Sequence, residues 1–481
     1  MKKIAAVALA LWAGMATIGA EDRPLSRWEA DVLAMEAYRP GYVFWQHIFT
    51  IPDGSIAFGS ARDGRLLAIF PTKGDWIRDA AWTEGALAPL LDGQQMPRDL
   101  DERRSLVASL LEPVVGPVLH NPTRGNFLAP GAQRYGRFLD EWAAIYGRFG
   151  VPADVGLAQA ILESGLDGLK RSEARAVGFC QWLERNWKQL DRLSPQTIEW
   201  RNQTTQAPYC AAYLTILATR YGSFIPAVSE HNAGGTNVGR ILINGERMGG
   251  RTIRDQYFLG SQLARDLRQL DLDGFKDLYR TYGPRSYFYA EMVFGNSFNV
   301  RNIAAATPQV KIFAMRTPRA IALAEIVRET KLPADEIRRF NPALAKRVPA
   351  GATLYLPRYV RAFGPDVSFW HRPPTEAYTS VLNDFLQLDL PPEQWDDRTA
   401  EPVLRDFQRR FRQTKTEEGS VMGTMLEYAM DAAFSSGQRE ILAEYRESDE
   451  VRQLFERGVI AREASRPAPT LEDASDGKAD D

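Results

Sequence analysis

The chain has 481 residues and a formal net charge of −2 at pH 7. A length of this order predicts about three domains. Hydrophobic residues make up 44% and charged residues 25% of the sequence, which is average for folded globular proteins and argues against a multi-span membrane protein. The near balance of acidic and basic residues argues against nucleic acid as a partner. The four histidines are widely spaced and none has the i, i+4 spacing of a zinc helix, so we expect no metal and no other cofactor.

The first segment, residues 1–20, has the pattern of a secretory signal peptide. Two lysines precede an apolar run from Ile4 to about Ile18, and the small residues Gly19 and Ala20 stand before an acidic pair. The alternative is a membrane anchor, for which an apolar run of about 15 residues is short. We therefore expect a periplasmic or otherwise exported protein that keeps no membrane span after signal cleavage.

The next region, residues 21–130, combines helical and β patterns. A helix is predicted around residues 28–37. Residues 44–71 are rich in β-forming side chains and are interrupted by Asp-Gly pairs at 53–54 and 63–64, which suit tight hairpin turns. This pattern predicts three short strands in an N-terminal β-containing region of unknown role.

Residues 131–300 are predicted to be helical, because their apolar residues recur at i, i+3 and i+4. A small unit follows at 310–357, and a mostly helical C-terminal region covers 358–463. The last residues, 464–481, have the composition of a disordered acidic tail. The fold class is therefore expected to be mainly α, or α+β overall, and the N- or C-terminal region is a candidate for binding a cell-envelope partner.

Glu163 is the most informative single residue. It lies at the end of a predicted helix with apolar flanks, directly before Ser164 and Gly165. The helix dipole and the loss of hydration both disfavour a charged carboxylate there, which is the environment of a neutral general acid. The alternative is a solvated glutamate at a helix end.

Further residues after Glu163 carry a recognisable pattern. Ser164 follows it directly, Ser172 lies nine residues on, Gly178-Phe179-Cys180-Gln181 comes next, and Asn186 completes the set. This stretch resembles the first two motifs of the family 1 lytic transglycosylases, which are goose-type-lysozyme-like enzymes that cleave peptidoglycan. The family has Gly-Leu-Met-Gln where this chain has residues 178–181. The similarity is greatest to the membrane-bound lytic transglycosylase D group, although the lipid-attachment cysteine of that group is absent.

Two further motifs of that family are matched less closely. His231-Asn232-Ala233-Gly234 stands where the family has Tyr-Asn-Ala-Gly. His231 thus replaces a tyrosine, and it either lines a sugar site or packs in the core. For the fourth motif, Tyr289 within residues 284–295 is the better match and Tyr257 is its rival.

The resemblance implies a lysozyme-like helical catalytic domain over residues 131–300 and a lytic transglycosylase activity on peptidoglycan glycan strands. Glu163 would be the single catalytic acid and base, because the family pattern gives the nearest acid, Asp167, no catalytic role, whereas most glycosidases use two carboxylates. The substrate-binding residues would be Ser172, Gly178, Gln181, Asn186, His231, Asn232 and Tyr289. The alternatives are a hydrolytic muramidase of the same fold and a non-catalytic wall-binding scaffold.

Two aromatic residues and two cysteines near these motifs leave alternatives open. Trp182 and Trp187 either stack on sugars or belong to the core. Cys180 and Cys210 form an even number in an oxidising compartment, so they either form a disulfide or remain separate buried thiols.

The unit at 310–357 resembles a LysM module with a βααβ arrangement. A predicted helix ends at Phe340-Asn341-Pro342, since proline disfavours helical geometry in the residue before it. Residues 348–351 then lead into a predicted strand at 353–357. The unit either binds glycan or serves as a structural spacer packed on the catalytic domain.

Overall fold

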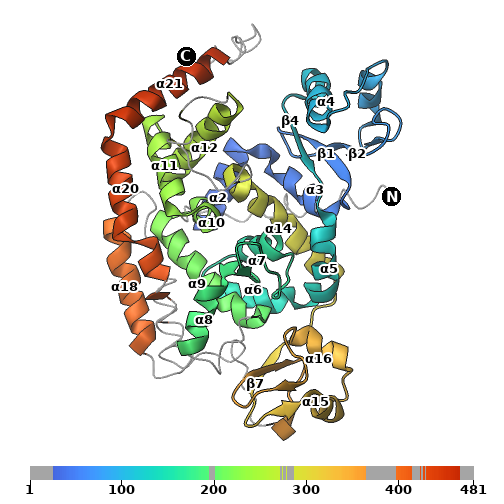
Figure 1. The fold of residues 1–481 in the computed structure, drawn as a ribbon, viewed down its shortest axis with the longest axis vertical. Helices are drawn as coiled ribbons and strands as arrows, with labels where there is room; N and C mark the ends of the chain where they lie inside the picture. Colours follow the sequence, from blue (N-terminus) through green and yellow to red (C-terminus); the bar gives the residue numbers. More distant parts are fainter. Residues whose placement is uncertain are drawn as a thin grey trace, which may run out of the picture.

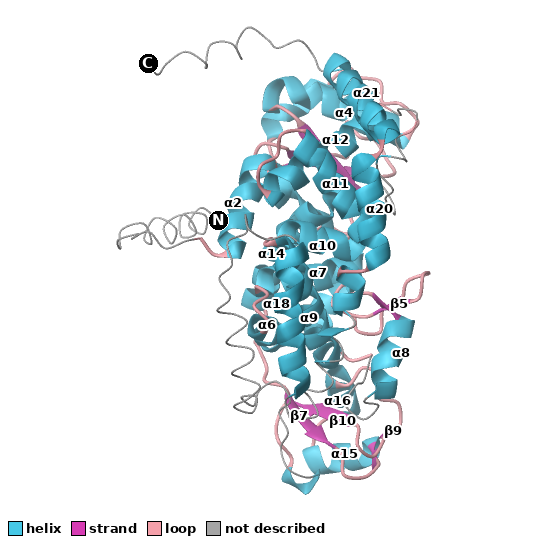
Figure 2. Cartoon of the chain, turned by 90° about the vertical axis from the view of Figure 1, so that its left-hand side faces the viewer, coloured by secondary structure: helices cyan, strands magenta, loops and turns pink. Residues whose placement is uncertain are grey.

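The structure is a computed structural model of the full chain. It describes residues 25–193, 201–270, 274, 278, 286–363, 397–413, 423, 426–427 and 429–465. The predicted signal peptide and nearly all of the predicted acidic tail lie outside the described residues. Helices dominate and the strands gather in small separate groups (Figure 2), so the predicted mainly α fold class is confirmed.

The N-terminal region begins with helices and continues into one sheet. Its elements are α2 (Arg27–Tyr38), the 3₁₀ helix η1 (Pro40–Phe44), α3 (Trp45–Thr50), β1 (Ser55–Ser60), β2 (Leu66–Pro71), β3 (Ala81–Trp82), the 3₁₀ helix η2 (Gly85–Leu91), α4 (Leu100–Val115) and β4 (Val118–Pro122). The four strands form an antiparallel sheet in the order β3-β2-β1-β4. Together with α4 and η2 this sheet encloses a small hydrophobic core of its own.

One predicted strand of this region is wrong. The residues before Asp53-Gly54 form η1 and α3, and only two strands, β1 and β2, lie within 44–71. Trp45, Ile48 and Phe49 are buried and have the i, i+3, i+4 spacing of a helix face. That face packs against α5 and α14, and this long-range packing outweighs the β propensity of the aromatic and branched side chains.

The central region consists mainly of packed helices. Its elements are α5 (Gly125–Tyr135), the 3₁₀ helix η3 (Gly136–Phe138), α6 (Leu139–Arg148), α7 (Ala153–Ser164), β5 (Ala176–Val177), β6 (Trp182–Leu183), α8 (Glu184–Leu193), α9 (Gln203–Tyr221), α10 (Phe224–Ala233), α11 (Gly235–Arg247), α12 (Ile253–Gln269), the 3₁₀ helix η4 (Ser286–Phe288) and α14 (Tyr289–Ala306). The closest packing joins α7 to α14, α9 to α10, and α11 to α12. Helix α7 therefore lies in the interior of the main hydrophobic core.

The main core does not divide at the predicted boundary near residue 131, because α2 and α3 belong to it. The buried carboxylate of Asp31 on α2 pairs with Arg254 of α12 at 2.7 Å. It also accepts hydrogen bonds from the hydroxyl of Ser223 and from the backbone N–H of Phe224. A buried charge is stable only when it is paired in this way, so α2 is fixed to α10 and α12.

The unit at 310–357 lies at the lower end of the molecule in Figure 1. It contains β7 (Phe313–Arg316), β8 (Ile321–Ala322), α15 (Leu323–Thr330), α16 (Ala334–Phe340), β9 (Arg347–Val348) and β10 (Thr353–Leu356). Antiparallel pairs join β7 to β10 and β8 to β9, and two helices lie between them in sequence. The unit has its own small hydrophobic core, and its two helices lie between strands as predicted, with two short strands on each side in place of one.

The C-terminal region consists, where it is described, of η5 (Arg361–Phe363), α18 (Asp397–Gln413), α20 (Ser436–Glu447) and α21 (Asp449–Ser465). The three helices run along one side of the central region, with α18 on α9, α20 on α11 and α21 on α12 (Figure 1). Buried side chains such as Tyr445 and Phe455 join this region to the main core.

Candidate active site

Glu163 is the second-last residue of α7, whose other faces are almost entirely buried. The helix ends at Gly165, which has the left-handed φ of +61° that favours glycine. The Glu163 side chain keeps partial exposure to solvent although protein surrounds it on most sides. Burial raises the pKa of its carboxyl from 4.5 to about 7, so a substantial fraction of Glu163 is protonated at neutral pH.

Tyr289 provides a hydrogen bond to this carboxyl group. It is the first residue of α14, it is buried, and its hydroxyl donates to Oε1 of Glu163. This bond lowers the pKa of Glu163, and burial raises that pKa by more. The rival Tyr257 lies elsewhere, because its hydroxyl is hydrogen bonded to the Ser229 hydroxyl at 2.6 Å. The structure thus brings Tyr289, and not Tyr257, to Glu163.

Two buried residues that affect the pKa of Tyr289 were not predicted from the sequence. The side-chain amide of Gln159 lies beside the Tyr289 hydroxyl and lowers its pKa, whereas burial and the Glu163 carboxyl raise it. Tyr146, on α6, is fully buried, and its phenol raises the pKa of Tyr289 electrostatically. The i, i+4 spacing of Gln159 and Glu163 was the available signal, because it places both side chains on one face of α7.

The loop that follows α7 carries Ser172 and Gln181, and their side chains shape its backbone. The Ser172 hydroxyl accepts the backbone N–H of Ala176 at 3.0 Å. The Gln181 amide donates to the carbonyl groups of Lys170 and Gly178, both at 3.1 Å. Both side chains therefore hold the β5–β6 hairpin in one conformation, whatever they contribute to substrate binding.

Gly178 packs this hairpin against α9. Its φ is +77°, and a Cβ atom at this position would lie 2.1 Å from the side-chain nitrogen of Gln206. Gln206 in turn accepts the backbone N–H of Phe179 and donates to the Gly168 carbonyl. The positive φ favours glycine here, and the hydrogen bonds of Gln206 join the loop to α9.

His231 contacts the same loop from α10. Its Nε2 lies 2.8 Å from the carbonyl oxygen of Cys180. Burial lowers the pKa of His231 to about 4, so the ring is neutral at physiological pH. A carbonyl oxygen only accepts hydrogen bonds, so Nε2 carries the proton. The ring is partly buried, as are the neighbouring Asn232 on α10 and Asn186 on α8.

A disulfide joins Cys180 of the loop to Cys210 of α9, with Cα atoms 5.9 Å apart. Trp182 and Trp187 are buried, and their ring centroids lie 5.1 Å apart. The Trp187 indole also donates to the Val177 carbonyl at 3.2 Å. Of the two alternatives, the core position fits these tryptophans. Their burial leaves no exposed ring face on which a sugar could stack.

The nearest other acid, Asp167, has a structural contact of its own. The Asp167 carboxylate accepts the backbone N–H of Leu169 at 2.9 Å and so stabilises the turn after α7. Within the described ranges, no three His, Cys, Asp or Glu side chains lie together as a metal site would require. In the same part of the chain, no helix combines the length and the apolar character needed to cross a bilayer.

No family model matches the chain, and no curated protein matches it.

Proposed function

We propose that the protein is an exported peptidoglycan lytic transglycosylase in which Glu163 is the single general acid and base. The observation that supports this most strongly is the state of Glu163. Its carboxyl has a pKa of about 7, is hydrogen bonded to Tyr289, and lies at the end of a helix directly before the loop that carries Ser172 and Gln181. A group with this pKa can give up a proton and take it back at neutral pH.

The first step breaks the glycosidic bond between N-acetylmuramic acid and N-acetylglucosamine. Protonated Glu163 donates its proton to the bridging oxygen, and C1 of the muramic acid develops positive charge as the bond breaks. The acetamido group of the substrate stabilises this charge. The Tyr289 hydroxyl donates to Oε1, so it stabilises the carboxylate that forms on Glu163.

The second step closes the product ring. The C6 hydroxyl oxygen of the muramic acid attacks C1, and the Glu163 carboxylate accepts the hydroxyl proton. The product is a 1,6-anhydro sugar, no water is consumed, and Glu163 is protonated again for the next cycle. The neutral side chains of Ser172, Gln181 and His231 suit this cycle, because a nearby charge would displace the pKa of Glu163 from the neutral range.

The test is mass spectrometry of the fragments that the mature protein releases from purified peptidoglycan sacculi. We expect anhydro-muramic ends, lighter than hydrolysed ends by the mass of one water. Glu163→Gln keeps the size of the side chain and removes the acid, so it should abolish release. Glu173→Gln makes the same change at an exposed position of the same loop and should retain activity.

Other outcomes would support the alternative functions. Reducing ends from the wild-type protein would identify a hydrolytic muramidase. Binding to sacculi without release by any variant would identify a wall-binding scaffold.

A further inference from the structure

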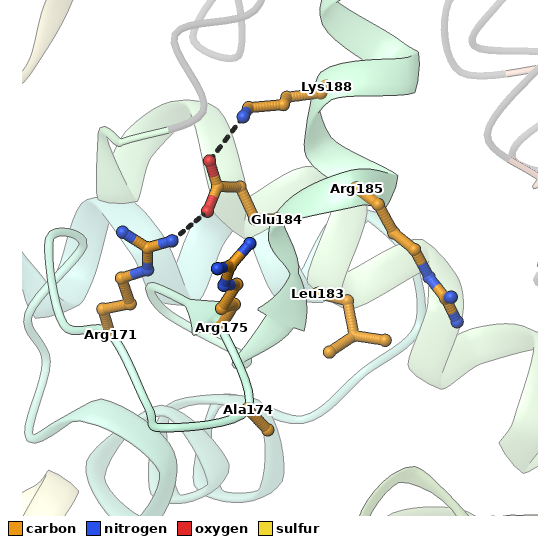
Figure 3. A pocket seen from close by; sticks show the side chains of 7 residues that line it. All are labelled: Arg171, Ala174, Arg175, Leu183, Glu184, Arg185 and Lys188. Carbon is orange, nitrogen blue, oxygen red and sulfur yellow. Dashed lines mark hydrogen bonds and ion pairs between the residues drawn. The ribbon is translucent and has the colours of Figure 1, made fainter.

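A pocket of about 370 Å³ opens on the β5–β6 hairpin and the first turns of α8 (Figure 3). It is lined by Arg171, Ala174, Arg175, Leu183, Glu184, Arg185 and Lys188. We call this set the basic pocket, because four of its side chains are cationic and one is acidic. The chain as a whole is slightly acidic, with a net charge of −2, so this surplus of positive charge is local.

The single acid of the basic pocket is already neutralised. Glu184 pairs with Arg171 at 2.5 Å and with Lys188 at 2.6 Å. Hydrogen bonding to Lys188 and the charges of Arg171 and Arg175 hold the pKa of Glu184 below its usual value, so its carboxylate stays charged. The two pairs orient the Arg171 and Lys188 side chains toward Glu184, as Figure 3 shows.

The ion pairs of Glu184 do not include the other two arginines of the pocket, although the charge of Arg175 also lowers the pKa of Glu184. Within the part of the chain that the structure describes, no ion pair of Arg175 or Arg185 is found, and both side chains are exposed. Arg175 points toward Glu184, while Arg185 extends past Leu183 on the other side of the pocket (Figure 3). An anion that enters the pocket would meet two planar guanidinium groups, which bind carboxylates through paired hydrogen bonds.

The basic pocket is built on the loop that carries the candidate substrate-binding residues. The backbone of Arg171 bridges to Val177, and the Arg175 carbonyl accepts the N–H of Glu184 at 2.9 Å. Ser172 lies between these two arginines in sequence, and its hydroxyl fixes the same turn. An anion in the pocket would therefore contact the same short segment that carries Ser172.

We propose that the basic pocket binds the carboxylates of the peptide stem that is attached to muramic acid. This inference rests on the proposed function, because it assigns a second part of the same substrate to a second part of the same loop. An intact peptide stem carries several free carboxylates at a distance from the sugar ring, whereas a strand whose stems an amidase has removed carries only the lactyl carboxylate of each muramic acid, directly on the sugar. The pocket thus favours glycan strands with peptide stems over strands from which the stems have been removed.

The test compares the full-length protein with the double variant Arg175→Gln/Arg185→Gln on two substrates. One substrate is sacculi with intact stems, and the other is the same glycan after amidase treatment. We expect the double variant to lose about fivefold in rate on the intact sacculi, a modest factor typical of exposed ion pairs, and to be unchanged on the denuded glycan. Raising the ionic strength should reduce the difference.

A matched control removes two exposed arginines outside the pocket and outside the unit at 310–357, Arg98→Gln/Arg457→Gln. It changes the net charge equally and should leave both rates unchanged. The proposal is overturned if the two double variants behave alike, or if the Arg175→Gln/Arg185→Gln variant loses equally on both substrates.

A binding measurement separates this proposal from the proposed activity. Sedimentation of Glu163→Gln with each substrate, with and without the two pocket substitutions, needs no turnover. If no protein cleaves glycan but the pocket substitutions still weaken binding only to stem-bearing strands, the activity is wrong and the pocket assignment stands. Competition by free stem peptide supports the carboxylate source, whereas competition by inorganic phosphate alone would overturn it.

Discussion

At the scale of the residue, the proposed function depends on two opposing influences on the pKa of Glu163. Burial of Glu163 disfavours its charged form, and the Tyr289 hydroxyl favours it. Burial has the larger effect, so the pKa lies near 7 and the acid can both give and take a proton at neutral pH.

This balance predicts the pH dependence of the rate. The first step needs protonated Glu163, so kcat/KM should fall as the pH rises through about 7. Tyr289→Phe removes the hydrogen bond that favours the carboxylate. The pKa of Glu163 should then rise, and the falling limb should move to higher pH by up to about one unit. A pH–rate profile on sacculi measures this shift.

The control for this prediction is Tyr257→Phe. It also removes a buried tyrosine hydroxyl, but that hydroxyl bonds to Ser229 and not to Glu163. Its profile should match that of the wild type. An equal shift in both variants would contradict the prediction. It would show that a general loosening of the core, and not loss of the bond to Glu163, determines the pH at which kcat/KM falls.

The residues of the site differ in how far the sequence could predict them. Glu163, Ser172 and Gln181 lie close together in sequence, so a local motif pointed to them. Tyr289 is 126 residues from its partner, and only the packing of α7 on α14 decides between it and Tyr257. Gln159 lies about one helical turn before Glu163, but it belongs to none of the matched motifs.

At the scale of the element, periodicity predicted the central helices well, because their apolar faces are long and regular. It failed for α3, which is only six residues long and whose aromatic residues also suit a strand. The contact of α3 with α14, more than 200 residues away in sequence, decides its conformation. The β5–β6 hairpin was equally hard to predict, since its shape depends on Gln206 and on the disulfide.

The disulfide should contribute to both stability and activity. It closes a loop of 30 residues between the hairpin and α9, and a loop of this length corresponds to about 3.6 kcal/mol. Cys180→Ser/Cys210→Ser should therefore lower the free energy of unfolding by about 2–4 kcal/mol. The Cys180 carbonyl would also lose its fixed position opposite His231, so cleavage should slow.

Urea unfolding and the rate of cleavage test this expectation. Reduction of the wild-type protein should reproduce the effect of the double substitution, and the same reductant should leave the double variant unchanged. Equal stability of oxidised and reduced wild type would contradict it.

At the scale of the whole molecule, the hydrophobic cores cross the predicted domain boundaries. Asp31 and Arg254 are 223 residues apart and form one buried ion pair. The unit at 310–357 has its own core, yet its Phe340 packs on Phe138 of η3 with centroids 4.7 Å apart. Such contacts leave no signal in composition or periodicity, so the boundaries inferred from the sequence describe patterns of secondary structure better than they describe units of packing.

The same contacts predict that the unit at 310–357 stabilises the adjoining helices of the central region through this interface. Asn202 donates to the Phe340 carbonyl at 2.9 Å, and the hydroxyls of Thr205 and Tyr355 are hydrogen bonded at 2.7 Å. Phe340→Ala removes the buried ring at this interface and should cost about 3 kcal/mol. Hydrogen exchange should then speed up in α6 and at the start of α9, as well as within the unit.

Ile326→Ala provides the comparison, because Ile326 is buried only in the unit's own core. It also removes a large buried side chain, with a cost of about 2–5 kcal/mol, but its effect on exchange should be confined to residues 310–357. If Phe340→Ala left exchange in α6 unchanged, the unit would be an independent domain tethered to the central region. If both variants speed up exchange in α6 equally, the two parts form one cooperative unit whose stability does not depend on this interface alone, and the special role assigned to Phe340 would be wrong.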